Sequence, residues 1–131
     1  MKKLNELLGT EFPIIQGGMA NIATGEFAAA CSNAGAFGVI ATGGMLEADL
    51  LRKQIRTCKS LTDKPFGVNL MLMNPCADEM AQIIIEEGVQ VVTTGAGSPG
   101  KYIPAWKEAG IKVLPVVAAS ILAKRLVNQG A

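Results

Sequence analysis

Residues 66–95, FGVNLMLMNPCADEMAQIIIEEGVQVVTTG, contain one complete strand–helix–strand unit. The apolar run 66–72 predicts a buried strand, and the stretch 78–87 predicts a helix that Gly88 stops. A second apolar strand, 89–93, follows at once. Because a helix joins two strands through short connections, we expect the strands to be parallel, with a right-handed crossover.

The same pattern recurs about five times along the chain. Strands are predicted at 13–16, 37–41, 66–72, 89–93 and 112–117. Helices are predicted at 25–33, 47–61, 78–87, 101–109 and 121–129. This alternation predicts an α/β fold, which is either a barrel or an open doubly wound sheet. Since a βα barrel closes at eight units and about 250 residues, we expect residues 1–131 to hold only the first five units of a barrel, as one incomplete domain.

Composition excludes several classes of protein. Half of the 131 residues are apolar and the net charge is +1, so the sequence gives no case for a nucleic-acid partner. No apolar stretch approaches the length of a membrane span, and the first residues contain no apolar run of the kind found in a signal peptide. Three cysteines without CxxC spacing are expected to be reduced thiols of a cytoplasmic protein. The sequence has no histidine and suggests no metal site.

Two adjacent glycines, Gly17 and Gly18, follow the first predicted strand. Ligands of parallel α/β proteins gather at the carboxyl ends of the strands. Without a Cβ, the backbone of both residues can approach a planar or anionic group closely. Two interpretations remain open at this point: contact with a ligand, or a tight turn that needs glycine.

The stretch 95–100, GAGSPG, matches the pattern G-x-G-x-x-G. A dinucleotide-binding fold should carry this pattern after its first strand, with an acidic residue at the end of the next one. Here the next strand ends in Ala118 and Ala119, so we reject that fold. The pattern is instead interpreted as a turn that opens a helix, with Ser98 as its cap and Pro99 at the first helical position.

Asn69 is the most informative polar residue, because it lies inside an apolar strand where asparagine is rare. A buried amide without a hydrogen-bond partner costs roughly 1–3 kcal/mol. At the mouth of a barrel, its side chain could donate and accept at once, which matches the edge of a flavin or a nucleobase. We favour this role over a bond to a neighbouring loop backbone.

Other conspicuous side chains are assigned to the framework. Tyr102 and Trp106 lie four residues apart on a predicted helix and are expected to pack together. Glu86 and Glu87 are interpreted as a solvated pair at a helix end.

Three segments carry a resemblance to a known family. The segments 16–20, QGGMA, 64–71, KPFGVNLM, and 91–97, VVTTGAG, resemble the N-terminal half of the flavin-dependent enoyl-acyl-carrier-protein reductases (enoyl reductase II). Those enzymes belong with the nitronate monooxygenases, formerly called 2-nitropropane dioxygenases. The resemblance runs in order over essentially the whole chain.

The resemblance implies a TIM (β/α)8-type barrel that binds FMN. Gly17, Gly18 and Met19 would line the flavin ring, and Asn69 would form a hydrogen bond with it. The cofactor-binding residues that the resemblance implies are Gly17, Gly18, Met19, Asn69, Thr94 and Gly95. The catalytic histidine of the family and its main phosphate-binding loops have no counterpart here, so no catalytic residue is assigned.

The activity that the resemblance implies is an FMN-dependent enoyl-acyl-carrier-protein reductase, which uses NADH to reduce 2-enoyl thioesters in bacterial fatty-acid synthesis. Its partner would be acyl-carrier protein or another acyl thioester, and the resemblance allows a homodimer. The alternative in the same fold is a nitronate monooxygenase, which oxidises alkyl nitronates with O₂. An alternative of another class is a non-catalytic flavin-binding fragment, since the expected barrel is incomplete.

Overall fold

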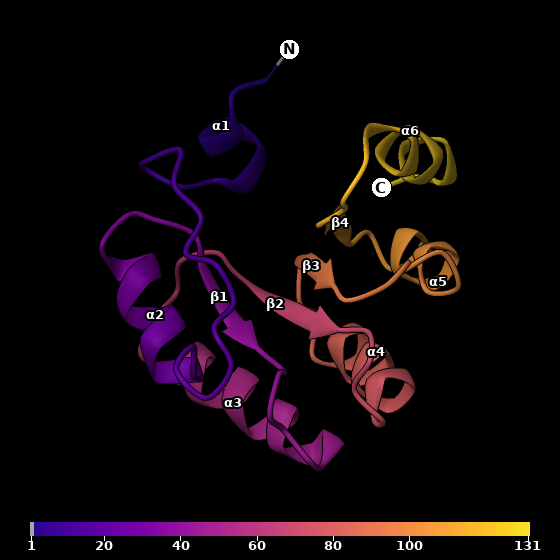
Figure 1. The fold of residues 1–131 in the computed structure, drawn as a ribbon. Helices are drawn as coiled ribbons and strands as arrows, with labels where there is room; N and C mark the ends of the chain where they lie inside the picture. The colour runs from indigo at the N-terminus through magenta and orange to yellow at the C-terminus, as the bar shows by residue number, and fades with distance from the viewer. Residues whose placement is uncertain (1) are drawn as a thin grey trace.

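The computed structural model describes residues 2–131. Helices and strands alternate along the chain after a short first helix, as the sequence predicts (Figure 1). The elements are α1 (Leu4–Leu8), α2 (Gly25–Asn33), β1 (Gly38–Ala41), α3 (Ala48–Leu61), β2 (Phe66–Met71), α4 (Ala77–Glu86), β3 (Val91–Gly95), α5 (Ile103–Glu108), β4 (Lys112–Pro115) and α6 (Ser120–Gln129).

The strands β1 to β4 form one parallel sheet in the order β1-β2-β3-β4. Each strand lies beside the next strand along the chain, and the order does not reverse among the described residues. A doubly wound sheet reverses its order at a switch point, whereas a barrel adds its strands in sequence. The topology therefore favours the barrel over the open sheet.

The two faces of the sheet are covered differently. Val68, Leu70 and Val92 belong to the larger core, which the helices α2 to α6 cover from the outer side of the curved sheet (Figure 1). On the inner side a small cluster forms around Phe37, and α1 contributes Leu8 to it. Burial of apolar side chains on both faces is the expected state of a parallel sheet.

The first predicted strand, at 13–16, is reduced to a single parallel bridge between Ile15 and Phe37. The backbone N–H of Val39 donates to the side-chain Oε1 of Gln16 at 3.0 Å, where a longer strand would offer a backbone carbonyl. The chain then leaves the sheet at Gly17. The prediction of a regular strand at 13–16 was wrong, because the side chain of Gln16 replaces the backbone acceptor that would continue the pairing to Val39.

Two other predictions need correction. The fifth helix begins at Ile103, because residues 99–102 form a turn in which the N–H of Tyr102 donates to the carbonyl of Pro99. Ser98 and Pro99 are therefore not its cap and first residue. The sequence analysis also missed α1, which ends at Gly9 with a φ of 71°; other ends differ from the prediction by at most about two residues.

Candidate functional site

The candidate site lies at the carboxyl ends of the strands, on the inner face of the sheet. Register places Asn69 of β2 between Ala41 of β1 and Thr93 of β3. Side chains alternate along a strand, so Asn69 points away from the outer core that Val68 and Leu70 enter. Asn69 is half-buried and reaches the inner face where ligands of such folds bind.

Gly18 lies directly against the side chain of Asn69. A Cβ added to Gly18 would meet the Cβ of Asn69 at 2.7 Å and its Nδ2 at 3.1 Å. Two positions on, Ala20 lies over the end of β1, because a Cβ added to Gly43 would approach the Cβ of Ala20 to 3.1 Å. The segment 17–20 thus crosses the carboxyl ends of β1 and β2, and the structure brings together two of the predicted residues.

Thr93 holds the amide of Asn69. Its Oγ1 donates a hydrogen bond to Oδ1 of Asn69 at 2.8 Å. Within residues 2–131, the Nδ2 of the same amide has no hydrogen-bond partner. A half-buried amide with a free donor is suited to bind the polar edge of a ligand.

Two buried residues that the sequence analysis passed over fix the backbone beneath the site. The hydroxyl of Thr42 donates to the carbonyl of Asn69 at 3.1 Å and accepts from the N–H of Met71 at 2.9 Å. The amide of Asn74 donates to the carbonyls of Thr42 and Met45, at 3.2 and 2.9 Å. Each stands at the end of an apolar strand or just beyond it, and that position was the available signal.

Gly17 and Met19 flank the contact between Gly18 and Asn69. A Cβ added to Gly17 would meet no atom within 4 Å, so its surroundings are open. The side chain of Met19 is 40% exposed, and its carbonyl accepts hydrogen bonds from Ile22 and Ala23 that close a turn. These two residues therefore leave apolar and backbone surface accessible beside Asn69.

Thr94 and Gly95 are not both brought to the same place. Gly95 pairs with Met71 on the inner face, and a Cβ added to it would meet open space. Thr94 follows the alternation of Val92 and points toward the outer core, where its hydroxyl is buried and finds no partner among residues 2–131. Only the backbone of Thr94 can reach the inner face.

None of the residues that meet at the site has an ionisable side chain. Amide, hydroxyl and backbone groups can bind and orient a neutral polar edge, but they supply no general acid or base that titrates near neutral pH. The free Nδ2 of Asn69 and the open space beside Gly17 and Gly95 fit a planar group with hydrogen-bonding edges. An arrangement of this kind suits a cofactor that carries the chemistry itself.

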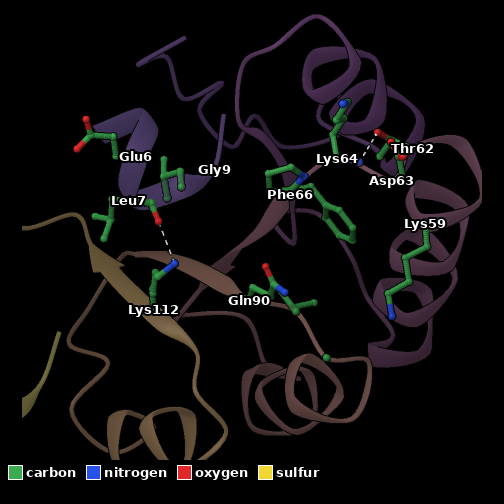
Figure 2. A pocket seen from close by; sticks show the side chains of 14 residues that line it. Glu6, Leu7, Gly9, Lys59, Thr62, Asp63, Lys64, Phe66, Gln90 and Lys112 are labelled. Carbon is green, nitrogen blue, oxygen red and sulfur yellow. Dashed lines mark hydrogen bonds between the residues drawn. The ribbon is translucent and has the colours of Figure 1, made fainter. Parts of the chain in front are cut away.

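A cavity of about 510 Å³ lies at the opposite end of the sheet (Figure 2). It is lined by α1 and by the turns that enter β2 and β3, and Lys112 bridges it by donating from Nζ to the carbonyl of Leu7 at 2.9 Å. None of the predicted cofactor-binding residues lines this cavity. Ligands of parallel α/β proteins bind at the other end of the strands, so we assign the cavity no part in the site.

A second cavity, of about 630 Å³, adjoins the carboxyl ends of β3 and β4. Ala96 and Gly97 line it on one side, and Leu122 and Arg125 of α6 on the other. The segment after Gly95 therefore borders this second cavity, which lies at the same edge of the sheet as Asn69 but is not lined by it. No helix within residues 2–131 is long and apolar enough to cross a membrane.

The family of the chain follows from its match to a family model. The model described as nitronate monooxygenase matches residues 1–131, which is the whole chain. The chain belongs to the nitronate monooxygenase family. This confirms the resemblance that the segments 16–20, 64–71 and 91–97 indicated.

Curated relatives support membership of the nitronate monooxygenase family. One relative, from Mycobacterium tuberculosis, is a 5-hydroxy-7a-methyl-1-oxo-octahydro-1H-indene-4-carboxyl-CoA dehydrogenase. It is 36% identical over 128 residues, which are 98% of this chain and 36% of the relative. A nitronate monooxygenase of Paraburkholderia phytofirmans is 44% identical over 80 residues, 61% of this chain and 22% of the relative. These relatives are oxidoreductases, and this member of the family spans about a third or less of their length.

Solved structures confirm the fold class. FabK from Thermotoga maritima is 49% identical, with a TM-score of 0.95, over 100% of this chain and 42% of the FabK chain. A nitroalkane oxidase from Streptomyces ansochromogenes has a TM-score of 0.84 at 24% identity, which shows the shared fold alone. The predicted α/β fold of the TIM-barrel type is thus confirmed for this nitronate monooxygenase family member.

Proposed function

We propose that the protein containing this chain is an FMN-dependent enoyl-acyl-carrier-protein reductase that uses NADH. The observation that carries the proposal is the likeness to FabK over the whole chain, at 49% identity. The contact between Gly18 and Asn69 supports the flavin, because it joins two segments that the resemblance assigns to the ring. The Mycobacterium relative is named for a carboxyl-CoA, which is also a thioester, and this supports a thioester substrate.

The residues of this chain would bind and orient the cofactor. When bound, FMN would supply the hydride transfer between NADH and the double bond of a 2-enoyl thioester. Asn69 would hydrogen-bond the polar edge of the ring, and Gly17 and Met19 would contact its face. Gly95 and the backbone of Thr94 would border the same space. We propose that the protein acts in the cytoplasm on acyl-carrier-protein thioesters, and that the catalytic groups lie outside residues 1–131.

The second candidate is a nitronate monooxygenase. The name of the family model and the relative from Paraburkholderia phytofirmans favour it. The two activities differ in what reduces the flavin. In the reductase the reductant is NADH, whereas in the oxygenase the nitronate itself reduces the flavin and O₂ reoxidises it.

Anaerobic stopped-flow measurements on the intact protein separate the candidates. We expect NADH to bleach the flavin absorbance rapidly and crotonyl thioester to restore it. NADPH is tested beside NADH as the alternative reductant, and propyl-2-nitronate is tested as the substrate of the monooxygenase candidate. Slow bleaching by NADH together with rapid bleaching by propyl-2-nitronate would assign the protein to the monooxygenases instead.

A further inference from the structure

The side-chain amide of Asn69 has a defined orientation that the sequence did not reveal. A terminal amide can rotate between two nearly equivalent orientations, since its last torsion joins an sp³ to an sp² carbon. One orientation presents Nδ2, a donor, to the inner face, and the other presents Oδ1, an acceptor. Which atom faces a ligand decides which edge of that ligand the protein can recognise.

The hydroxyl of Thr93 decides between these orientations. Thr93 lies beside Asn69 in the neighbouring strand, and its Oγ1 is 2.8 Å from Oδ1. With Oδ1 on this side, the hydroxyl proton has an acceptor. If the amide were reversed, Nδ2 would donate to Oγ1, and the hydroxyl proton would lose the acceptor that it has within residues 2–131. Leaving a half-buried donor unpaired is unfavourable, so the first orientation is preferred.

The free Nδ2 then faces the segment that crosses the strand ends. It lies 3.1 Å from the position that a Cβ of Gly18 would take. The backbone of Asn69 is held by Thr42, which is buried. The carbonyl of Asn69 accepts one hydrogen bond from the N–H of Thr42 and one from its hydroxyl, each at 3.1 Å. With the backbone held, the orientation of the amide depends on its partner in β3.

We propose that Thr93 is a positioning residue that presents Asn69 to a bound flavin as a hydrogen-bond donor. Asn69 then recognises an acceptor of the ring, which is a carbonyl oxygen or an unprotonated ring nitrogen, and not the ring N–H. The inference rests on the proposed function, because it requires a flavin at this site. It adds a residue that touches no ligand and yet selects which edge of the ring faces β2.

The role of Thr93 is tested first by FMN titration of the apo form of the intact protein. Thr93→Val keeps the branched shape and removes the hydroxyl, whereas Thr93→Ser keeps the hydroxyl. We expect the affinity of Thr93→Val for FMN to be about five- to tenfold lower and that of Thr93→Ser to stay within about twofold of wild type. Equal affinity of wild type and Thr93→Val would overturn the proposal.

Substitutions of Asn69 test whether its side chain donates a hydrogen bond to the flavin. Asn69→Asp replaces the amide by an acceptor of the same shape, and Asn69→Ala removes it. If the amide donates, Asn69→Asp binds FMN more weakly than Asn69→Ala, because an acceptor then faces an acceptor. An Asn69→Asp variant that binds FMN as tightly as wild type would show that residue 69 accepts from the ring N–H, and the proposal would be wrong.

A measurement without FMN separates this inference from the proposed function. The side-chain amide signals of Asn69 in a ¹⁵N-correlated NMR spectrum of the apo protein should be one sharp pair in wild type and Thr93→Ser. In Thr93→Val they should shift and broaden as both orientations become populated. Failure of wild type to bind FMN would sink the proposed function, whereas unchanged amide signals in Thr93→Val would sink the role of Thr93.

Discussion

Gly18 shows that a position can require glycine for a reason that the sequence alone does not reveal. The sequence left two reasons for a glycine at position 18 open, which were contact with a ligand and a tight turn. In the structure, the space of its missing Cβ belongs to Asn69, whose Cβ would be 2.7 Å away. Real Cβ atoms do not approach so closely, so any residue other than glycine at position 18 must displace Asn69 or the segment itself.

We therefore predict that Gly18→Ala lowers the free energy of unfolding by about 1–3 kcal/mol through overpacking. Gly17→Ala is the matched control, because its Cβ would meet no atom within 4 Å and should change the stability of the apo protein by less than about 0.5 kcal/mol. Urea denaturation of the apo forms measures both. Equal stability of the two variants would show that the segment 17–20 shifts freely over β2.

The pairing of α3 with α4 shows what helix periodicity leaves out. Glu87 was interpreted as solvated, but its side chain is only 9% exposed. It accepts hydrogen bonds from Arg52 at 2.9 Å and from Arg56 at 2.9 and 3.1 Å, and Lys59 lies 3.8 Å away. The interpretation of Glu87 was therefore wrong, because its cationic partners come from another helix that periodicity cannot place.

This cluster predicts a pH dependence of stability. The hydrogen bond from Arg56 lowers the pKa of Glu87 below its usual 4.5, with further contributions from Arg52 and Lys59. A lowered pKa in the folded state means that the carboxylate stabilises the fold above pH 4.5 and loses this effect as the pH falls through the lower folded-state value. We expect Glu87→Gln to lower the melting temperature by on the order of 5 °C at pH 7, and by progressively less below pH 4.5.

The control for Glu87→Gln is Glu108→Gln, at an exposed position without an ion pair among residues 2–131. Its melting temperature should follow wild type at every pH. Thermal denaturation by circular dichroism between pH 3 and 8 measures all three proteins. A constant difference between wild type and Glu87→Gln across this range would contradict the assignment.

The elements themselves were largely predictable from local signals. Helices that end in glycine, such as α4 before Gly88, combine an apolar stripe with a left-handed stop, and both are visible in the sequence. The shortening of the first strand to one bridge was not predictable, because the side chain of Gln16 replaces the backbone partner of Val39 there. Helix α1 carries Leu4, Leu7 and Leu8 at helical spacing before Gly9, so that signal was present but was not used.

At the scale of the whole molecule, the three cysteine thiols differ in how deeply they are buried. Cys58 is fully buried in the larger core, and burial raises its pKa to about 11. Cys31 and Cys76 are partly exposed. Because the thiolate is the reactive form, Cys58 should react only when the core opens.

We predict that a disulfide exchange reagent at pH 8 modifies Cys31 and Cys76 in the native protein and leaves Cys58 unmodified. Reaction of Cys58 should appear with urea at the same midpoint as the loss of helical circular dichroism, since it requires global opening. Peptide mass spectrometry identifies the modified residue, and Cys58→Ser provides the blank. Modification of Cys58 in the native protein, at the rate of Cys76, would contradict its placement in the core.

The candidate site was predictable only in part. Its residues stood out because Asn69 is polar inside an apolar strand and because Gly18 follows a strand. Which partners they meet depends on the register between β2 and β3, and no local pattern of the sequence specifies that register. The resemblance placed Thr94 at the site, but side chains alternate along β3, so its neighbour Thr93 points to the inner face and bonds Asn69.

The hydrogen bond from Lys112 to Leu7 also affects when helix α1 can complete its contacts during synthesis on the ribosome. The two residues are 105 positions apart, so a ribosome that adds about 5–20 residues per second makes Lys112 roughly 5–20 s after Leu7. During that interval Leu4 and Leu8 are already made, but Leu114, their neighbour in the inner cluster, is not. Helix α1 is therefore made well before the contacts that Lys112 and Leu114 give it, and its leucines lack these neighbours until β4 has been synthesised.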